Sequence, residues 1–234
     1  MYVFGKNVAK ELLDNKTKIK NVYLVNDFND KEIEDELKIN HIRINYISKK
    51  EMDKLCDGNH QGILLNIDDY NYLSDYDMLD NLDDNSFIVI LDHIEDPHNF
   101  GAIIRTCEAA GVDYIIIPKD RSVKVNSTVM KTSCGALDNV KIVMTTNLNN
   151  IIKKLKDKGV WIVGTTLDAD TSYDSVDYRT STAIVIGNEG AGMSSLVMKN
   201  CDFIVNIPMI GKINSLNASV AAGIMIYEVV RQRR

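Results

Sequence analysis

The sequence predicts an α/β fold in which a parallel sheet is preceded by a second, smaller α/β unit. One observation is that short apolar runs alternate with amphipathic stretches along the whole chain, as strands and helices do. Another is that the later strand candidates are continuous apolar runs, such as FIVILD (87–92), DYIIIP (113–118) and TAIVIG (182–187). Runs of this kind indicate a parallel sheet that is covered by helices on both faces.

Residues 1–67 form the predicted smaller unit. The pattern indicates a helix, a strand, a helix, a strand, a short helix and a final strand, over residues 9–13, 19–25, 31–38, 41–47, 49–56 and 62–67. This is a compact α/β unit.

Residues 68–85 are predicted to be an acidic linker. Residues 68–84 hold seven acidic side chains and no basic one, whereas the chain has a net charge of −6. Without this stretch the chain is close to neutral, at +1, so its composition neither supports nor excludes an RNA partner. The alternative interpretation is a solvated loop inside a single domain.

Residues 86–234 form the predicted parallel-sheet unit. Besides the three strands above, it has strand candidates at 140–144, 160–166 and 203–208, and helix candidates at 99–111, 125–136, 148–159 and at the end of the chain. The four cysteines are widely spaced, without a CxxC pair, so we expect buried free thiols, a reducing compartment and no metal site. No apolar run has the length of a membrane span or of a signal-peptide core, so we expect a cytoplasmic protein without a membrane partner.

The segment IGNEGAGM (186–193) follows an apolar strand. Glycines at such a place let a ligand approach the backbone at the carboxyl edge of a parallel sheet. The spacing differs from both the dinucleotide fingerprint and the phosphate-binding loop. Glu189 would repel a phosphate, so a cationic or neutral ligand fits better. The alternative is a glycine-rich turn without a ligand.

The segment DPHNFGAIIRTCEAAG (96–111) is a helix candidate in which Asn99 is placed to cap the start. Gly101 and Arg105 are four residues apart and share one helix face. The alternative role for Arg105 is a surface pair with Glu108. After the next strand, Lys119, Arg121 and Lys124 form a basic cluster that could hold phosphates or could be a solvated face.

The segment IPMIGKINSLNASVAAG (207–223) joins a strand to the last helix. Asn217 can cap that helix. A helix cap does not account for Asn214 and Ser215, nor for the apolar Leu216 inside a polar turn.

Three such segments, in this order and each at a strand end, resemble the three motifs of the SPOUT-class RNA 2'-O-ribose methyltransferases of the SpoU/TrmH family. The matching residues of the first motif are Asn99, Gly101 and Arg105. The second motif matches IGNEGAGM with Glu189, and the third matches IPMIGKINSLNASVA. The resemblance covers residues 86–234. The first 67 residues are similar to the family's RNA-binding domain, which has a ribosomal-protein-like fold, and HQGI (60–63) is typical of its end.

The resemblance implies a trefoil-knotted parallel-sheet domain, a homodimer, S-adenosylmethionine as cofactor and RNA as partner. It implies that Gly187, Ile207, Leu216 and Thr165 hold the cofactor. The catalytic set that it implies is Arg105, Asn99, Glu189, Ser215 and Asn217. Lys119, Arg121 and Lys124 are the candidate RNA-binding residues.

The substrate that the resemblance favours is a guanosine of 23S rRNA, either as free RNA or in an assembling large subunit. HQGI, DPHN and PKDRS are typical of that branch, whereas the tRNA-modifying branch typically lacks the first domain. The alternatives are a tRNA site, the rRNA site of the thiostrepton-resistance enzymes, and a non-catalytic RNA-binding paralogue. A nicotinamide-dependent oxidoreductase is disfavoured because the dinucleotide fingerprint is missing.

Arg105 has two possible roles. As general base it would have to be neutral, which costs roughly 7 kcal/mol at pH 7 because arginine has a pKa above about 12. Burial would help that role. As a charged group it would stabilise the developing alkoxide and orient a phosphate.

Overall fold

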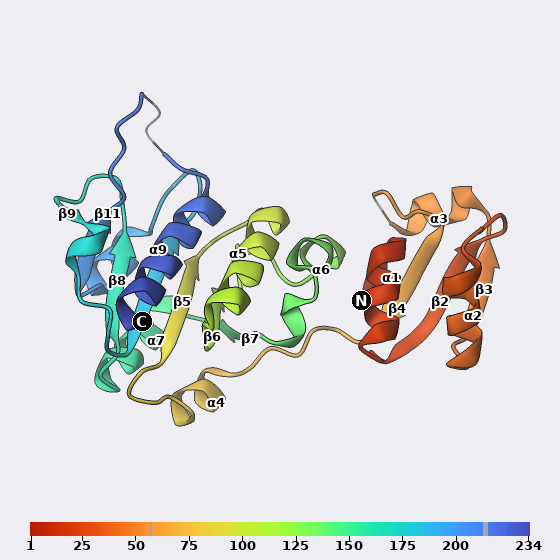
Figure 1. The fold of residues 1–234 in the computed structure, drawn as a ribbon, viewed down its shortest axis with the longest axis horizontal. Coiled ribbons are helices and arrows are strands. Elements are labelled where there is room, and N and C mark those ends of the chain that lie inside the picture. The colour runs from red at the N-terminus through yellow and green to blue at the C-terminus, as the bar shows by residue number, and fades with distance from the viewer. Residues whose placement is uncertain (57, 213–214) are drawn as a thin grey trace. The chain divides into compact units, whose positions relative to one another are not determined.

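The computed structural model describes residues 1–56, 58–212 and 215–234. The chain forms two compact units (Figure 1). Unit 1 comprises Met1–Asn71 together with Val125–Lys131, and unit 2 comprises Tyr72–Lys124 together with Thr132–Arg234.

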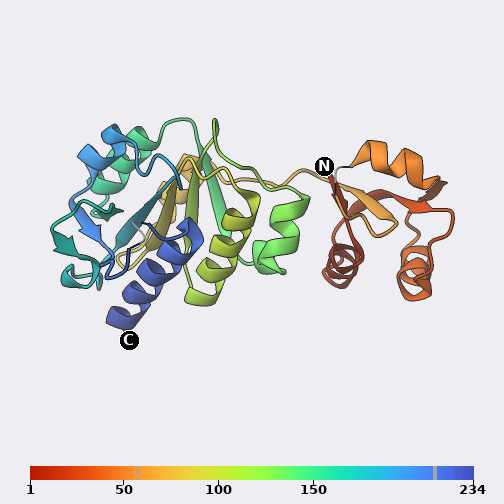
Figure 2. The same cartoon turned by 90° about the horizontal axis from the view of Figure 1, so that it is seen from above.

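Unit 1 is built on a four-stranded sheet in the order β1-β4-β2-β3. Its strands are β1 (Tyr2–Phe4), β2 (Ile19–Val25), β3 (Ile44–Ile47) and β4 (Ile63–Ile67). Its helices are α1 (Lys6–Asp14), α2 (Lys31–Ile39) and α3 (Lys49–Leu55). Figure 2 shows α1 and α2 on one side of this sheet and α3 on the other. The strand β1 was not predicted, because three residues are too few to show a periodic pattern.

The HQG turn of unit 1 has a structural role. His60 is buried, its Nδ1 accepts a hydrogen bond from Gly62 N at 2.9 Å, and its Nε2 lies 2.9 Å from Asp53 Oδ1. Gln61 and Gly62 have φ of +51° and +83°, and Gln61 Oε1 accepts from Lys6 N. The turn therefore ties the start of β4 to α1 and α3.

Unit 2 is built on a seven-stranded sheet in the order β7-β6-β5-β10-β8-β11-β9, with every named pair parallel. The strands are β5 (Phe87–Asp92), β6 (Tyr114–Pro118), β7 (Lys141–Thr145), β8 (Trp161–Thr165), β9 (Thr171–Ser172), β10 (Thr182–Gly187) and β11 (Phe203–Asn206). The predicted α/β class with a parallel sheet is confirmed.

Helices cover both faces of this sheet (Figures 1 and 2). These helices are α4 (Asp75–Asp80), α5 (Pro97–Ala110), α7 (Leu148–Asp157), α8 (Ser195–Asn200) and α9 (Ala218–Arg233), with short 3-10 turns at Ala136–Asp138 and Tyr173–Ser175. The helix α6 (Ser127–Ser133) belongs to unit 1 up to Lys131, and unit 2 resumes at Thr132. α5 packs against α9 on one face, and α7 packs with α4 and α8 on the other.

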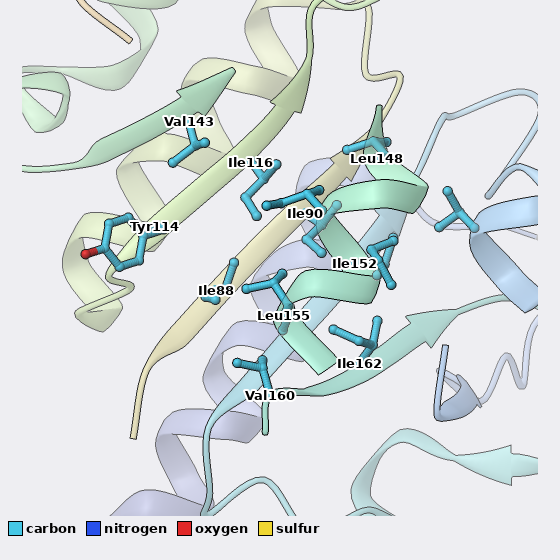
Figure 3. Close-up of a cluster of buried hydrophobic side chains, with 14 of the residues drawn as sticks. Ile88, Ile90, Tyr114, Ile116, Val143, Leu148, Ile152, Leu155, Val160 and Ile162 are labelled. Atoms are coloured by element: carbon cyan, nitrogen blue, oxygen red, sulfur yellow. The ribbon is translucent and has the colours of Figure 1, made fainter. Parts of the chain in front are cut away.

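The core beneath α7 is made of apolar side chains from five neighbouring strands and from the helix itself (Figure 3). Ile88, Ile90 and Ile116 project from the sheet towards Ile152 and Leu155 of α7. All five are fully buried. Each such side chain contributes about 1.5–3 kcal/mol when it leaves water.

The segment predicted to be a linker, residues 68–85, differs from that prediction from Tyr72 onward. Leu73 pairs with Val143 of β7, α4 follows with Met78 fully buried, and Thr145 Oγ1 donates to Asp75 Oδ2 at 3.0 Å. The many acidic residues of this segment suggested a solvated linker, so the helix was not predicted. Met78 and the Ser74–Asp77 capping box were the local signals for it.

The prediction that the cysteines are buried free thiols is only partly right. Among the described residues none of the four forms a disulfide, but Cys107 is buried whereas Cys134 is exposed. Burial raises the pKa of the Cys107 thiol well above its usual range. Among the described residues, none of the helices has the length and apolar character needed to cross a lipid bilayer.

The end of the chain is fastened to unit 2. The Arg233 guanidinium donates from Nε, Nη1 and Nη2 to the carbonyl oxygens of Tyr178, Asn85 and Thr180, at 2.9, 2.7 and 2.6 Å. It also lies over the Phe87 ring, 5.2 Å from its centroid. Arg233 therefore anchors the last turn of α9 to the segments that lead into β5 and β10.

We expect Arg233→Ala to lower the free energy of unfolding of unit 2 by about 2 kcal/mol, because hydrogen bonds from a charged donor are lost. Chemical denaturation with a probe in unit 2 measures the change. Arg234→Ala is the matched control, because Arg234 is exposed and its loss changes stability by less than about 0.5 kcal/mol. Equal losses of stability in the two variants would contradict the anchoring role of Arg233.

Candidate functional site

The carboxyl ends of four adjacent strands, β5, β10, β8 and β11, lie at one edge of the unit 2 sheet. Ligands of open α/β sheets bind at this edge. Thr165 ends β8, Gly187 ends β10 and Ile207 follows β11, so three sequence-predicted cofactor residues lie side by side.

A cavity of about 420 Å³ lies at this edge. All four sequence-predicted cofactor residues line it, together with Glu189 and Ser215 of the predicted catalytic set. Its walls come from the β8 end, the glycine loop, the β11 end and the start of α9; they are Thr165–Asp168, Ile186–Gly192, Ile207, Met209, Ser215, Leu216, Ala218 and Ala221. Its volume falls in the range of about 300–1,000 Å³ that is typical of small-molecule sites.

Gly187 is required by a close approach of two backbone segments. A Cβ atom on Gly187 would lie 2.4 Å from Gly192 C and from Met193 N. The backbone of the returning loop therefore occupies the place of a side chain. This lets residues 188–192 fold over the end of β10 and form one wall of the cavity.

Asn188 holds the glycine loop in shape. Its Oδ1 accepts from Gly190 N and Ala191 N, at 2.9 and 3.1 Å, and its Nδ2 donates to His93 O at 2.8 Å. Its backbone exchanges two hydrogen bonds with Gly192. Sequence reasoning missed this residue. An asparagine directly after a buried strand was the available signal, because its side chain can bond the backbone two residues on.

Asp92 fastens the other end of the same loop. It is 1% exposed, its Oδ2 accepts from Ser194 N and its Oδ1 lies beside His93 Nδ1, both at 2.6 Å. Sequence reasoning missed it too. The signal was a carboxylate at the end of an otherwise apolar strand, since a buried charge needs partners.

The three segments singled out in the sequence are joined by direct hydrogen bonds. Asn99 Nδ2 donates to Glu189 Oε1 at 2.6 Å, and Asn217 Nδ2 donates to Asn99 Oδ1 at 2.9 Å. Asn217 Oδ1 in turn accepts from Ser219 N and Ser219 Oγ, at 2.9 and 2.6 Å. One polar chain thus runs from the start of α9 through Asn99 of α5 to the glycine loop.

The prediction that Asn217 caps the last helix is confirmed, since it is the N-cap of α9. Asn214 lies outside the described residues. The prediction that Asn99 caps α5 is wrong. Asp96 is the N-cap, accepting from His98 N at 2.9 Å, and Pro97 takes the first helical position. Asn99 lies one turn inside and is buried, so its amide is available for Glu189 and Asn217.

Two sequence patterns match this chain. The SpoU rRNA Methylase family matches residues 86–227, and the pattern described as RNA 2'-O ribose methyltransferase substrate binding matches residues 2–73. The chain is also 43% identical, over 99% of its length and 95% of the relative, to a Staphylococcus saprophyticus protein assigned to the TrmH family of tRNA/rRNA methyltransferases.

The chain belongs to the SpoU/TrmH family of RNA methyltransferases. A Bacillus subtilis protein assigned to the same family is 39% identical over 99% of this chain and 96% of that protein.

Two solved structures have the same fold. The SpoU methyltransferase AviRb from Streptomyces viridochromogenes, in complex with the cofactor AdoMet, has a TM-score of 0.77, 23% identity and coverage of 100% of this chain and 90% of AviRb. The A. aeolicus TrmH/SpoU tRNA modifying enzyme has a TM-score of 0.59, 34% identity and coverage of 68% of this chain and 84% of that enzyme.

Arg105 of this SpoU/TrmH family member is exposed on α5. In the described part of the chain its hydrogen-bond partner is Cys134 Sγ, at 3.7 Å from Nη1, and it takes no part in the chain through Asn99. The alternative pair with Glu108 is not formed among these residues. Instead, Asn139 Nδ2 donates to Glu108 Oε1 at 3.5 Å.

The basic cluster lies on the loop after β6. Lys119, Arg121 and Lys124 are all exposed. Arg121 lines a second, smaller cavity of about 200 Å³ with His93, Asp120 and Asn147 at the ends of β5, β6 and β7. Within the described residues there is no cluster of three or more His, Cys, Asp or Glu side chains that could hold a metal ion.

We expect Gly187→Ala to lower the free energy of unfolding by about 2 kcal/mol or more, because the new methyl group overlaps backbone atoms of the returning loop. Gly190→Ala is the matched control in the same loop, because the nearest atom to its Cβ would be 3.6 Å away. Denaturant titration measures both. If the two variants lose equal stability, the close approach at Gly187 is not what requires a glycine.

Proposed function

We propose that this family member transfers a methyl group from S-adenosylmethionine to a ribose 2'-hydroxyl of RNA. The observation that carries the proposal is the cavity at the strand ends, whose wall holds Glu189 and is joined to Asn99 and Asn217 by hydrogen bonds. The match of residues 2–73 to a substrate-binding pattern of 2'-O ribose methyltransferases supports the choice of acceptor.

The cavity suits S-adenosylmethionine in size and in chemistry. Gly187, Ile207 and Leu216 can hold the cofactor through the main chain, and Thr165 can line its adenosine side. Thr165 Oγ1 already donates to Val185 O at 2.9 Å, so its side chain is held in place. The Glu189 carboxylate suits a cofactor that carries a sulfonium cation and no phosphate. When bound, this cofactor supplies an electrophilic methyl group.

In this proposal the polar chain orients the acceptor. The bound cofactor would give its methyl group to the 2'-oxygen and leave as its demethylated product, and the hydroxyl proton would pass to solvent water. Asn99, Glu189, Ser215 and Asn217 place the ribose in line with the methyl group. Because Asn99 already donates to Glu189 and accepts from Asn217, its amide is fixed before substrate binds, which lowers the cost of ordering the site.

We propose the charged role for Arg105. The role of general base called for burial, and Arg105 is exposed in this chain. As a cation it stabilises the developing alkoxide and orients an RNA phosphate, while Lys119, Arg121 and Lys124 hold neighbouring phosphates.

We propose a guanosine of 23S rRNA as the acceptor. An rRNA methyltransferase from Sinorhizobium meliloti, solved with AdoMet bound, shares the fold over 98% of this chain, whereas the tRNA modifying enzyme matches 68% of it. The two-unit architecture thus favours rRNA. The 34% identity to that tRNA enzyme makes tRNA the second candidate. Homodimerisation, the trefoil knot and a cytoplasmic location stay predictions.

Mapping 2'-O-methyl groups on 23S rRNA and tRNA, from cells with and without this protein, tests the substrate. We expect one 23S position to lose its methyl group when the protein is absent. If the 23S methylation map is unchanged and a tRNA loses a methyl group, the substrate is tRNA. Calorimetry tests the cofactor, since the enzyme must bind S-adenosylmethionine or its demethylated product.

We expect Arg105→Lys to keep substantial methyl transfer, because it keeps the positive charge, and Arg105→Ala to lose about 10²-fold or more. Single-turnover methylation of purified RNA measures both. If Arg105→Lys loses as much as Arg105→Ala, charge alone is insufficient and the base role regains support. Neither variant changes cofactor binding, because Arg105 lies outside the cavity wall.

A further inference from the structure

The two faces of the unit 1 sheet differ, and strand register shows which side chains share a face. Successive side chains of a strand point to opposite faces. Tyr2 pairs with Asn66 and Asn66 with Asn21, while Tyr23 pairs with Asn45. These five side chains therefore lie on one face, together with Leu64, which pairs with Tyr23.

The opposite face is the apolar core of unit 1. Its side chains include Val3, Val22, Leu24 and Leu65, which are fully buried in one cluster with α1 and α2. On the first face, α3 covers one end, where Met52 and Leu64 form a second cluster against which the partly buried Tyr23 packs. The rest of this face carries polar and aromatic side chains. We call it the tyrosine face, and it consists of Tyr2, Asn21, Tyr23, Arg43, Asn45 and Asn66.

Two aromatic rings lie on the tyrosine face, Tyr2 on the edge strand β1 and Tyr23 on β2. The rings of Tyr2 and Tyr23 have centroids 6.3 Å apart and planes tilted by 57°. Tyr2 is 45% exposed. An aromatic ring on an open sheet surface offers a flat apolar area on which an unpaired base of single-stranded RNA can stack.

Three asparagines surround these rings. An amide has both a donor and an acceptor, as the edges of nucleobases do. Asn45 Nδ2 donates to Val22 O at 3.3 Å. Asn21 Oδ1 is shielded and accepts no hydrogen bond in the described part of the chain. An unsatisfied amide oxygen is costly, and a base amino group that bonds Asn21 Oδ1 would remove that cost.

The tyrosine face carries a positive charge, Arg43, at its β3 side, where an RNA phosphate could bind. Arg43 precedes β3 and lies on this face by alternation, because its neighbours Ile42 and Ile44 pack in the opposite core. It is exposed and forms no ion pair with any described residue. The carboxylates of Asp68 and Asp69, which follow β4, are paired with Lys20 and with the amine of Met1, at 2.7 and 2.9 Å.

We propose that the tyrosine face binds a single-stranded segment of the RNA substrate, with bases stacked on Tyr2 and Tyr23 and a phosphate on Arg43. The proposal rests on the proposed function, because it gives the substrate-binding unit a defined RNA surface. RNA fits better than a protein partner, because the face joins the exposed ring of Tyr2 and the partly buried ring of Tyr23 to amides and one unpaired cation rather than to an apolar patch.

Fluorescence anisotropy of the full chain with a short unstructured RNA oligonucleotide of mixed sequence tests the proposal. We expect Tyr2→Ala to weaken binding about fivefold or more, because stacking on one side chain is lost. Tyr2→Phe keeps the ring and stays within about twofold of the wild type. Arg43→Ala lowers the slope of log affinity against log salt by about 0.7, the value for one phosphate of a single strand.

Tyr46→Ala is the matched control. Tyr46 is also an exposed tyrosine of the same sheet, at 52%, but it lies on the opposite face and donates to Glu34. We expect it to bind the oligonucleotide as the wild type does. Thermal unfolding of every variant separates lost binding from lost folding. If Tyr2→Ala stays folded and binds RNA as well as Tyr46→Ala, the tyrosine face is not an RNA surface.

Two further measurements separate this proposal from the proposed function. In methylation of purified rRNA, Tyr2→Ala raises the KM for RNA and leaves kcat and the affinity for S-adenosylmethionine unchanged. If the wild type and Tyr2→Ala methylate rRNA with the same KM, the tyrosine face does not bind the substrate. The proposed methyltransferase activity is unaffected by that result. If Tyr2→Ala changes the molecular mass in solution rather than RNA affinity, the face is a contact between copies of the chain.

Discussion

The parallel pairing of β10 with β5 is the constraint on which the site depends. Their register runs from Thr182 opposite Phe87 to Gly187 opposite Asp92, so both strands end at the same level. The glycine loop therefore begins beside the segment that leads into α5. Asp92 can then fasten Ser194, Asn188 can reach His93 O, and Asn99 can reach Glu189. Residues about ninety positions apart in the chain become neighbours through six paired residues.

The N-terminus of α9 determines which atoms donate and which accept along the hydrogen-bond chain at the site. The first backbone N–H groups of α9 donate to Asn217 Oδ1. This leaves Asn217 Nδ2 to donate to Asn99 Oδ1, and Asn99 Nδ2 to donate to Glu189. Each amide is thereby oriented, and the chain ends on a group that can only accept when ionised. An aspartate at position 99 would lack the donor and would meet Glu189 with a like charge.

Much of the fold could be predicted from the sequence because its strands are long apolar runs. β2, β5 and β10 match their predicted ranges, and a Gly such as Gly159, at φ +82°, stands after a helix as expected. The short elements β1, α4 and α8 were not predicted, since a few residues give no period to read. The order of strands was also out of reach, because β10 pairs with β5 across about ninety residues and local patterns carry no information on such pairing.

The sequence motifs predicted residues that turn out to be hydrogen-bonded to one another, but not the contacts between them. The motifs named Asn99, Glu189 and Asn217, and the structure joins them. Asn99 was misread as a cap because Asp96 and Pro97, three and two positions earlier, form a better helix start. Asn188 and Asp92 act through backbone atoms of the loop, which a list of side-chain types does not reveal. Their roles depend on where the chain returns after Gly187.

The helix α9 is held at both of its ends. At its start Asn217 is bonded to Asn99, and at its end Arg233 holds three carbonyl oxygens. The first turn of the helix is a wall of the cavity, so the far anchor also limits how readily that wall can fray. Amide protons in the middle of α9 are therefore expected to exchange with solvent only when unit 2 opens as a whole, as in the most stable segments of a protein. The lifetime of the α9 part of the cavity wall is then set by the unfolding of the whole unit.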